Sequence, residues 1–301
     1  MKKFLLVFVA LFAAFTGLQA KTGLVVIAHG HVLESWRKPV LALEQTLKTR
    51  LAERGINDFD YVRIAMMEYT EPSVASVIID CEKQGIDTVF ALPLFIAPSS
   101  HSEDDLPNIL RLKFSKDVHA ELEEEGTKFV HSDIKIILGP TLYSTDILEK
   151  IMFERVMSMS KDPENEAVVI LAHGDPDRVG FWNELLSRTA EYVKQNSKIS
   201  YSDGEQVAMG MHMADDLMDI LDKAAQNKKR IIVQGIYLTS NVKSMATRIG
   251  MLDKQKTLEN KGVEIVYGGH GILPESTAEV TDWIIDRAEE WKKSEIKICG
   301  L

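Results

Sequence analysis

The sequence predicts an α/β protein made of two similar, doubly wound parallel-sheet domains with a cleft between them. Short runs rich in Val, Ile and Leu alternate with longer segments of helical periodicity, a pattern typical of parallel βαβ units with helices on both faces. The order of elements occurs twice, and a polar, turn-rich link at 161–165 separates the two copies. We therefore expect an N-terminal domain at 21–162 and a C-terminal domain at 163–301.

The first predicted strand of each half ends in the same dipeptide, His-Gly, at His29 and at His173. His29 and Glu68 are 39 residues apart, and so are His173 and His212. This equal spacing predicts an internal duplication in which His173 and His212 occupy the positions of His29 and Glu68.

The predicted N-terminal domain begins with a continuous, β-branched strand at 23–28, which indicates burial on both faces. A helix follows from Glu34 and stops at Gly55, because glycine commonly ends helices. Glu71-Pro72 opens the next helix, since proline is tolerated in a first turn. The other elements expected here are strands at 61–67, 88–95 and 134–138, a loop at 96–102, a mostly helical segment at 103–124 and a helix at 144–160.

The predicted C-terminal domain repeats this alternation. Its expected strands are at 167–172, 206–211, 230–238 and 263–267, and its expected helices are at 179–195, 214–226, 242–259 and 275–293. In open parallel sheets, ligands bind beyond the carboxyl ends of the strands. Both His-Gly pairs lie at such ends, so we expect the chemistry at one edge of each sheet, facing the cleft.

The first twenty residues resemble a secretory signal peptide. Lys2 and Lys3 precede a short apolar run, Phe4–Phe15, and Ala20 ends the segment before Lys21. The run is shorter than the roughly 20 residues that a membrane-spanning helix needs. We therefore expect cleavage after residue 20, a periplasmic or otherwise exported protein, and no stable membrane insertion. An uncleaved N-terminal anchor is the alternative.

Composition excludes several classes of function. The formal net charge of −10 argues against binding nucleic acid, which favours clustered Lys and Arg, but it permits a small anionic ligand bound by local groups. No GxxxxGK[ST] or GxSxG motif occurs, so ATP-driven chemistry and serine hydrolysis lose support. The two cysteines, Cys81 and Cys299, show no metal spacing, and their oxidation state is left open. An oligomer is compatible with this composition.

Three residues of the first half are the candidate site: His29, Glu68 and His101. Each ends a predicted strand or lies in the loop that follows one, so the three side chains are expected to converge at one edge of the sheet. Two imidazoles and a carboxylate suit a divalent ion such as Co²⁺, Fe²⁺, Ni²⁺ or Zn²⁺. Three protein ligands leave a coordination position open, as a catalytic or transferring site requires.

The second half lacks the third residue of this set. Aligning 88–95 with 230–237 places Lys243 opposite His101, and a protonated lysine does not ligate a metal. Lys243 is instead a candidate partner for a substrate carboxylate, together with Ser99 and Ser100 near a predicted helix N-terminus. A second metal site at His173 and His212 remains an open alternative.

The same segments resemble the sirohydrochlorin cobaltochelatase and ferrochelatase family, the class II, ATP-independent tetrapyrrole chelatases. The resemblance lies in 24–30, in Met66-Met67-Glu68, and in 93–101 followed by Asp105-Leu106-Pro107. It implies a chelatase-like fold in a long, two-half form, and it assigns the metal to His29, Glu68 and His101. The chain departs from the family at Ser100, where glycine is usual, and in its export signal.

The function expected from the resemblance is insertion of a divalent metal into sirohydrochlorin or a related tetrapyrrole without ATP. Co²⁺ is the favoured ion, with Ni²⁺ or Fe²⁺ as alternatives. One rival is a periplasmic metal or haem carrier that uses the same residues without turnover. Another is a two-lobed receptor for an organic anion, whose binding would be indifferent to loss of Glu68.

Overall fold

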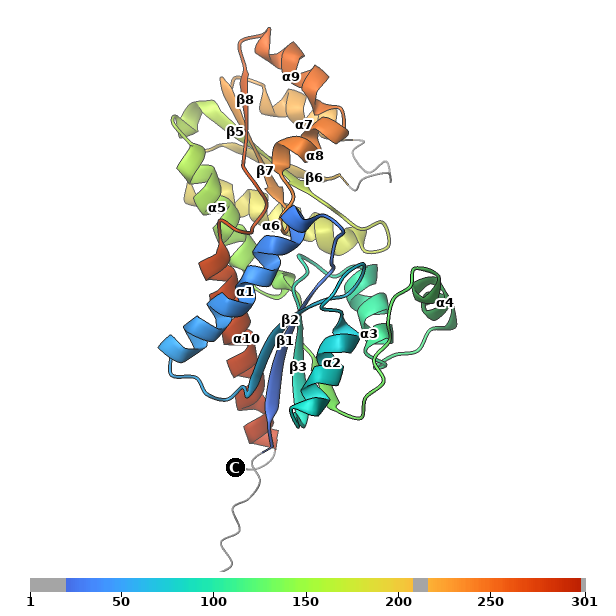
Figure 1. Cartoon of the computed structure of the whole chain (residues 1–301). Helices are drawn as coiled ribbons and strands as arrows, with labels where there is room; N and C mark the ends of the chain where they lie inside the picture. Colours follow the sequence, from blue (N-terminus) through green and yellow to red (C-terminus); the bar gives the residue numbers. More distant parts are fainter. Residues whose placement is uncertain (1–19, 208–215, 299–301) are drawn as a thin grey trace, which may run out of the picture.

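The computed structural model describes residues 20–207 and 216–298. These form two α/β lobes stacked end to end (Figure 1), each built on a four-stranded parallel sheet. The predicted fold class is confirmed. Most of the expected signal peptide, together with His212 and Cys299, lies outside the described residues. Among the described helices, none is both long and apolar enough to cross a bilayer.

The N-terminal sheet has the strand order β2-β1-β3-β4, and its strands are joined by crossover segments. The elements are β1 (Thr22–Ala28), α1 (Glu34–Glu53), β2 (Tyr61–Met66), α2 (Val74–Lys83), β3 (Thr88–Pro93), the π-helical segment η1 (His101–Asp105), α3 (Leu106–Ile109), α4 (Lys116–Glu124), β4 (Lys135–Leu138), η2 (Leu142–Ser144) and α5 (Ile147–Met159).

The second sheet has the corresponding order, β6-β5-β7-β8. Its elements are η3 (Pro163–Asn165), β5 (Glu166–Ala172), α6 (Val179–Asn196), β6 (Tyr201–Gln206), α7 (Leu217–Ala224), β7 (Arg230–Ile236), α8 (Val242–Arg248), α9 (Met251–Glu259), β8 (Glu264–Tyr267) and α10 (Thr277–Ile298). A common strand order is what a duplicated unit would produce, and duplication itself stays a prediction.

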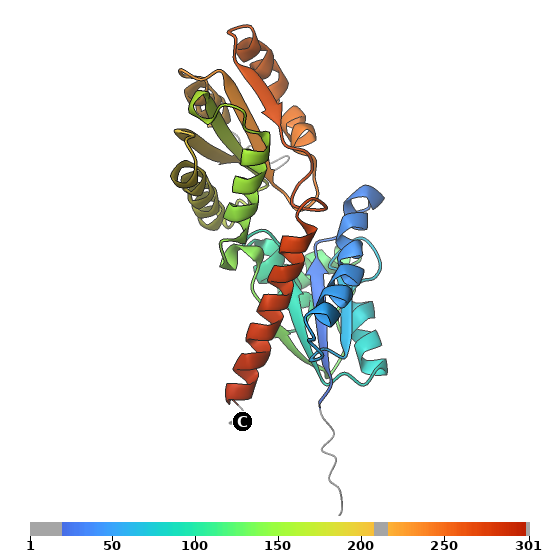
Figure 2. The same ribbon diagram turned by 90° about the vertical axis from the view of Figure 1, so that its left-hand side faces the viewer.

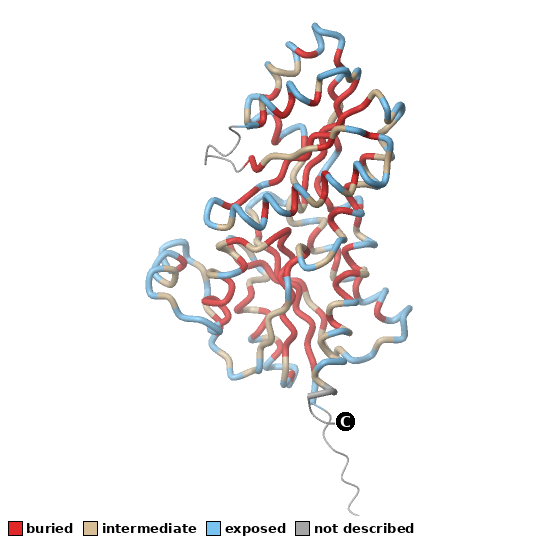
Figure 3. The backbone as a smooth tube through the Cα atoms, turned by 180° about the vertical axis from the view of Figure 1, so that it is seen from behind, coloured by how far each residue is buried: buried red, intermediate tan, exposed pale blue. Residues whose placement is uncertain are grey.

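Strand β1 is apolar along its whole length because it is covered on both faces. Leu24 and Val26 belong to the core that includes α1, whereas Val25 and Ile27 belong to the core that includes α2 and α3. Successive side chains of a strand point to opposite faces, so a continuous run such as this one fills both cores. Figure 3 shows the buried residues concentrated along the strands of both lobes.

The two lobes exchange their last helices. Helix α10, at the end of the second half, runs alongside the N-terminal lobe (Figure 2), where it packs against α1. Its Trp291 ring stacks on Phe90 of β3 at 4.8 Å between ring centroids. Conversely, α5, from the first half, packs against α6 and β7 of the second lobe. Each lobe therefore completes its core with a helix from the other half of the sequence.

Three expected elements differ in the structure. The strand expected at 206–211 instead occupies Tyr201–Gln206, a polar edge strand paired only with β5. The helix expected at 242–259 is two helices, because Gly250 adopts a left-handed φ of 79° between them. The segment expected to be helical at 103–124 is also interrupted after Leu110, where Arg111 has a φ of 58°.

Candidate metal site

The candidate metal site lies at the carboxyl edge of the N-terminal sheet. His29 directly follows β1, Glu68 comes two residues after β2, and His101 begins the segment η1 after β3. The backbone continues the β1–β2 ladder past its formal end, because the Glu68 N–H donates to the His29 carbonyl at 2.9 Å. This bond fixes His29 and Glu68 side by side.

The three predicted side chains come together in the structure. One potential ligand atom from each of His29, Glu68 and His101 lies within 4.8 Å of the others. His29 Nε2 is 3.5 Å from Glu68 Oε2, and the two imidazole centroids are 4.4 Å apart. Two ligands at about 2.1 Å from a tetrahedral ion are roughly 3.4 Å apart, so the His29–Glu68 separation is near that of bound ligands.

Each imidazole of the cluster has one ring nitrogen occupied by a hydrogen bond. His29 Nδ1 lies 2.9 Å from the Gly30 carbonyl oxygen, which can only accept, so Nδ1 carries the proton of the neutral ring. His101 Nδ1 lies 2.7 Å from the Asp105 carboxylate. These partners leave Nε2 of each neutral ring with a lone pair for a metal ion.

The protein environment separates the pKa values of the two histidines. Burial, and next the nearby His101, lower the pKa of His29 to about 4. Burial by itself would lower the pKa of His101, but its hydrogen bond to Asp105 and the charge of Glu68 raise that pKa overall. Burial also raises the pKa of Glu68. His29 is therefore neutral at physiological pH and ready to act as a ligand.

Two backbone features hold this arrangement. Gly30 has a φ of 99°, and a Cβ placed on it would approach the Glu68 carbonyl oxygen to 2.3 Å. Only glycine allows this close approach without a shift of the backbone. Tyr69, next to Glu68, also has a positive φ, 64°, which is uncommon for a residue with a side chain. Its ring centroid is 5.7 Å from that of His29.

Three large apolar side chains close in sequence to His29 and Glu68 are exposed to solvent. Val32 and Leu33, in the loop after His29, are 67% and 56% exposed, and Tyr69 is 58% exposed. Large apolar side chains at such exposure beside a polar cluster mark a ligand-binding surface more often than a stability element. The arrangement can present a bound ion to a flat molecule with an apolar face.

The structure assigns different roles to the serines predicted to bind substrate carboxylates. Ser99 is buried, and its hydroxyl and backbone pair with Ser102 inside the loop. The N–H and the hydroxyl of Ser100 both donate to Asp175 of the other lobe, at 2.9 and 3.2 Å. The N–H and hydroxyl of Ser100 are therefore already paired with a carboxylate of the protein itself. Lys243 is exposed in the first turn of α8, in the segment after β7.

The predicted equivalence of His212 and Glu68 falls on a residue outside the described part of the chain. Within the described part, Ala172 pairs with Gln206 as Ala28 pairs with Met66, so β6 ends where the sequence predicted that this strand begins. His173 follows β5 as His29 follows β1, and it contributes to lowering the pKa of His29.

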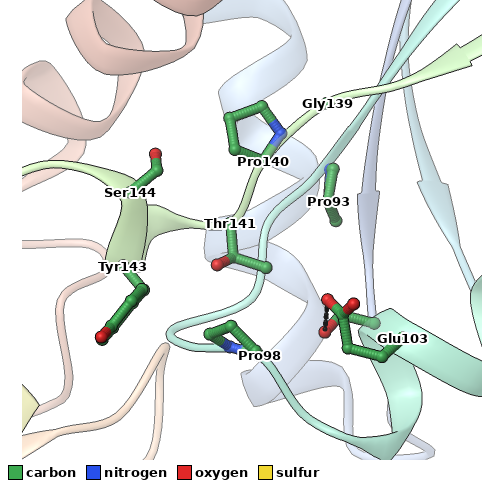
Figure 4. A pocket seen from close by; sticks show the side chains of 9 residues that line it. Pro93, Pro98, Glu103, Gly139, Pro140, Thr141, Tyr143 and Ser144 are labelled. Carbon is green, nitrogen blue, oxygen red and sulfur yellow. Dashed lines mark hydrogen bonds between the residues drawn. The ribbon is translucent and has the colours of Figure 1, made fainter. Parts of the chain in front are cut away.

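A cavity of about 210 Å³ lies behind the loop that leads to His101 (Figure 4). Its lining residues come mainly from this loop and from the segment after β4: Pro93, Pro98, Ser102, Glu103, Gly139, Pro140, Thr141, Tyr143 and Ser144. None of the three cluster residues lines it. Ligand pockets for larger molecules have about 300–1,000 Å³, so this cavity is too small for a tetrapyrrole.

The contact of Asp175 with the loop before His101 was not predicted from the sequence. Asp175 is in the second lobe, two residues after His173, and lies 75 residues from Ser100 along the chain. The repeated motif was the available signal, since His29-Gly30-His31 corresponds to His173-Gly174-Asp175. Nothing in that motif indicates that the acid reaches the other lobe.

Part of the chain is similar to known chelatases. The CbiX family model matches residues 23–159. A sirohydrochlorin cobaltochelatase of Methanococcoides burtonii is 27% identical over 140 residues, which cover 46% of this chain and 97% of that protein. Another, from Methanococcus maripaludis, is 33% identical over 87 residues, which cover 29% of this chain and only 56% of that protein.

A solved structure matches the fold of nearly the whole chain. SirB from Bacillus subtilis with Fe³⁺ has a TM-score of 0.63 at 14% identity, over 90% of this chain and 95% of that one. At this identity the likeness concerns the paired-lobe fold alone. The CbiX family model covers the lobe that carries the cluster, which is somewhat less than half of the chain.

Proposed function

We propose that this protein inserts a divalent metal ion into sirohydrochlorin or a closely related tetrapyrrole without ATP. The observation that carries the proposal is the convergence of His29, Glu68 and His101 within 4.8 Å at the carboxyl edge of β1, β2 and β3. The curated relatives are named sirohydrochlorin cobaltochelatases, which supports the tetrapyrrole as the class of substrate.

In this proposal, the metal ion is a substrate that the cluster holds briefly. The Nε2 atoms of His29 and His101 and the carboxylate of Glu68 supply three ligands. An open coordination position then remains, through which pyrrole nitrogens replace the protein ligands. The side chains of His29 and His101 are 27% and 41% exposed, so the ion is accessible from solvent and from a docked substrate.

Insertion releases two pyrrole protons, and the site offers a group to receive one of them. Glu68 is almost fully buried, and this burial raises its pKa above the ordinary carboxylate value. A carboxylate with a raised pKa is a better proton acceptor. Glu68 therefore balances the charge of the incoming ion and accepts a proton as the ion leaves.

The apolar side chains beside the cluster provide a surface for the face of the macrocycle. Val32, Leu33 and Tyr69 are exposed and flank His29 and Glu68 in the sequence. A flat tetrapyrrole placed on them would bring its central nitrogens to the cluster. Burial of each such side chain against the ring contributes about 1.5–3 kcal/mol of hydrophobic free energy at most.

Co²⁺ is the proposed ion, with Ni²⁺ and Fe²⁺ as alternatives. Imidazole and carboxylate ligands accept several first-row ions, and affinity alone does not select among them. The names of the relatives favour Co²⁺.

The test is a spectroscopic assay with the purified protein. Sirohydrochlorin is mixed with Co²⁺, Ni²⁺ or Fe²⁺, and absorbance changes are followed under multiple-turnover conditions, with Glu68→Gln as the matched variant. We expect repeated turnover with the wild-type protein and a large loss with Glu68→Gln. Stoichiometric binding without turnover would instead indicate a carrier and contradict the proposal.

We also propose that the protein is exported after cleavage behind Ala20. The support is the positive start and short apolar run of the first twenty residues. Mass spectrometry of the protein isolated from a bacterial periplasm tests this proposal. A mature N-terminus at Lys21 is expected, and an intact Met1 form in the cytoplasm would contradict it.

A further inference from the structure

The segment that carries His101 is held by the C-terminal lobe. Asp175 lies in the loop after β5 and is only 6% exposed. Its Oδ2 accepts hydrogen bonds from the backbone N–H and the hydroxyl of Ser100, at 2.9 and 3.2 Å. Ser100 directly precedes His101, so the carboxylate binds the backbone one residue before a predicted metal ligand.

Asp175 is itself anchored within its own lobe. Its Oδ1 accepts from the Asp177 N–H at 2.8 Å, and its own N–H donates to Gln206 Oε1 at 3.3 Å. Gln206, at the end of β6, donates in turn to Asn183 of α6 at 2.6 Å. The carboxylate of Asp175 is therefore held by the second lobe, and it in turn holds Ser100, the residue before η1.

The equivalent loop of the first lobe shows what the carboxylate adds. His31 corresponds to Asp175, and its Nδ1 accepts from the N–H two residues ahead, at Leu33, just as Asp175 Oδ1 accepts from Asp177. The local turn thus needs one acceptor only. A carboxylate has a second oxygen, and in Asp175 that oxygen bonds across the lobe boundary.

Two further contacts join the second lobe to the same segment. Arg178 donates to Asp104 of η1 at 2.8 Å. Trp182 Nε1 donates to the Pro98 carbonyl at 3.2 Å. Three residues at or near the start of α6 therefore hold the segment from Pro98 to Asp104: Asp175, Arg178 and Trp182.

We propose that Asp175 is a positioning residue for the metal site, through which the C-terminal lobe holds His101 in the geometry that binds the ion. The inference rests on the proposed function. It gives the second lobe, which carries no complete ligand set among its described residues, a defined part in metal binding. Groups that orient a metal ligand from outside the coordination shell typically change metal affinity by about 10–100-fold when they are lost.

Asp175→Asn is the decisive variant, because it keeps the shape of the side chain and removes one of the two carboxylate oxygens. The matched control is Asp282→Asn. Asp282 also joins the two halves of the sequence through a carboxylate, by ion pairs to Arg50 and Arg54 between α10 and α1, with no part in the cluster. Both variants remove one negative charge from a contact between the two halves of the sequence.

The measurement is titration of the metal-free, full-length protein with Co²⁺, followed by the visible absorption of the bound ion. We expect Asp175→Asn to weaken Co²⁺ binding by about ten-fold or more, and to raise the KM for Co²⁺ with little change in that for sirohydrochlorin. Asp282→Asn is expected to keep wild-type Co²⁺ affinity, although its unfolding temperature decreases.

A double-mutant cycle with Ser100→Ala tests the pathway of the effect. Asp175 and Ser100 act through one contact, so the double variant should bind Co²⁺ little worse than Asp175→Asn alone. Additive losses, or unchanged Co²⁺ affinity in Asp175→Asn, would overturn the positioning role while leaving the proposed function intact. A wild-type protein that binds no Co²⁺ would overturn both.

Discussion

The hydrogen-bond partners of the two imidazoles decide the chemistry at the scale of single residues. His29 is partly buried and paired with a neutral carbonyl, whereas His101 is paired with the carboxylate of Asp105. Of these two partners, only Asp105 favours the protonated ring. The two ligands therefore differ in how readily a proton competes with the metal ion.

Replacing His101 by alanine should abolish metal insertion without unfolding the protein. The side chain is 41% exposed, so its loss removes a ligand and leaves no large buried cavity. Insertion rates and thermal unfolding measure the two effects. His131→Ala is the control, because His131 is exposed and lies outside the cluster. Wild-type rates in His101→Ala would contradict the assignment.

Protonation of His101 should set the acid side of the pH–rate profile. A protonated imidazole cannot bind a metal ion, and the pKa of His101 is raised above 6.5, whereas that of His29 is lowered to about 4. The rate should therefore fall as the pH decreases through the His101 pKa, while His29 stays neutral.

Asp105→Asn tests this assignment of the acid limb. The variant removes the hydrogen bond that raises the pKa of His101, so the limb should move to lower pH even as metal affinity decreases. NMR titration of the histidines in the metal-free protein checks the same shift directly. An acid limb that stays in place would show that another group controls it.

Among the helices, α10 joins the end of the chain to the core of the first lobe. It belongs to the second half of the chain, yet it covers one face of the first sheet, with Trp291 stacked on Phe90. Further along, Lys292 donates to Thr22 at the start of β1. The packing of α10 therefore supports the strands whose ends carry the metal cluster.

Trp291→Ala should destabilise the protein. Loss of a partly buried aromatic ring from a stacked pair is expected to cost about 2 kcal/mol, below the usual range for fully buried tryptophan. Denaturant unfolding measures this loss. Trp291→Phe keeps a stacking ring and should lose much less. Equal losses in the two variants would show that stacking on Phe90 does not matter.

The exchange of α5 and α10 makes the two lobes interdependent at the scale of the whole molecule. The apolar face of α5 packs on the second lobe, and that of α10 packs on the first. The boundary expected between 162 and 163 separates the strands of the two sheets, but each half then lacks the helix that completes its core.

A fragment of residues 21–162 should not fold alone. It would expose the face of β1 and β3 that α10 covers, together with the free face of α5. We expect it to bind an apolar dye and to show no cooperative unfolding. Co-expression with residues 163–301 should restore a soluble complex. Cooperative unfolding of the isolated fragment would contradict the interdependence of the lobes.

The apolar pattern of the chain is enough to predict the buried strands and the residues that follow them. Strand β1 is recognisable because a strand covered on both faces must be apolar at every position. His29 and Glu68 could be predicted as neighbours in a site, because the carboxyl ends of parallel strands share one edge of the sheet. His101 required only that its loop return to that edge.

The contacts between the lobes could not be predicted from the chain and are visible only in the folded protein. Strand β6 was expected later in the chain, because an edge strand can be polar and its sequence then lacks the pattern of a buried strand. The exchange of helices and the bond from Asp175 to Ser100 join positions far apart in the chain. Local patterns report how a residue is buried within its own element, whereas such contacts depend on how completed elements pack against one another.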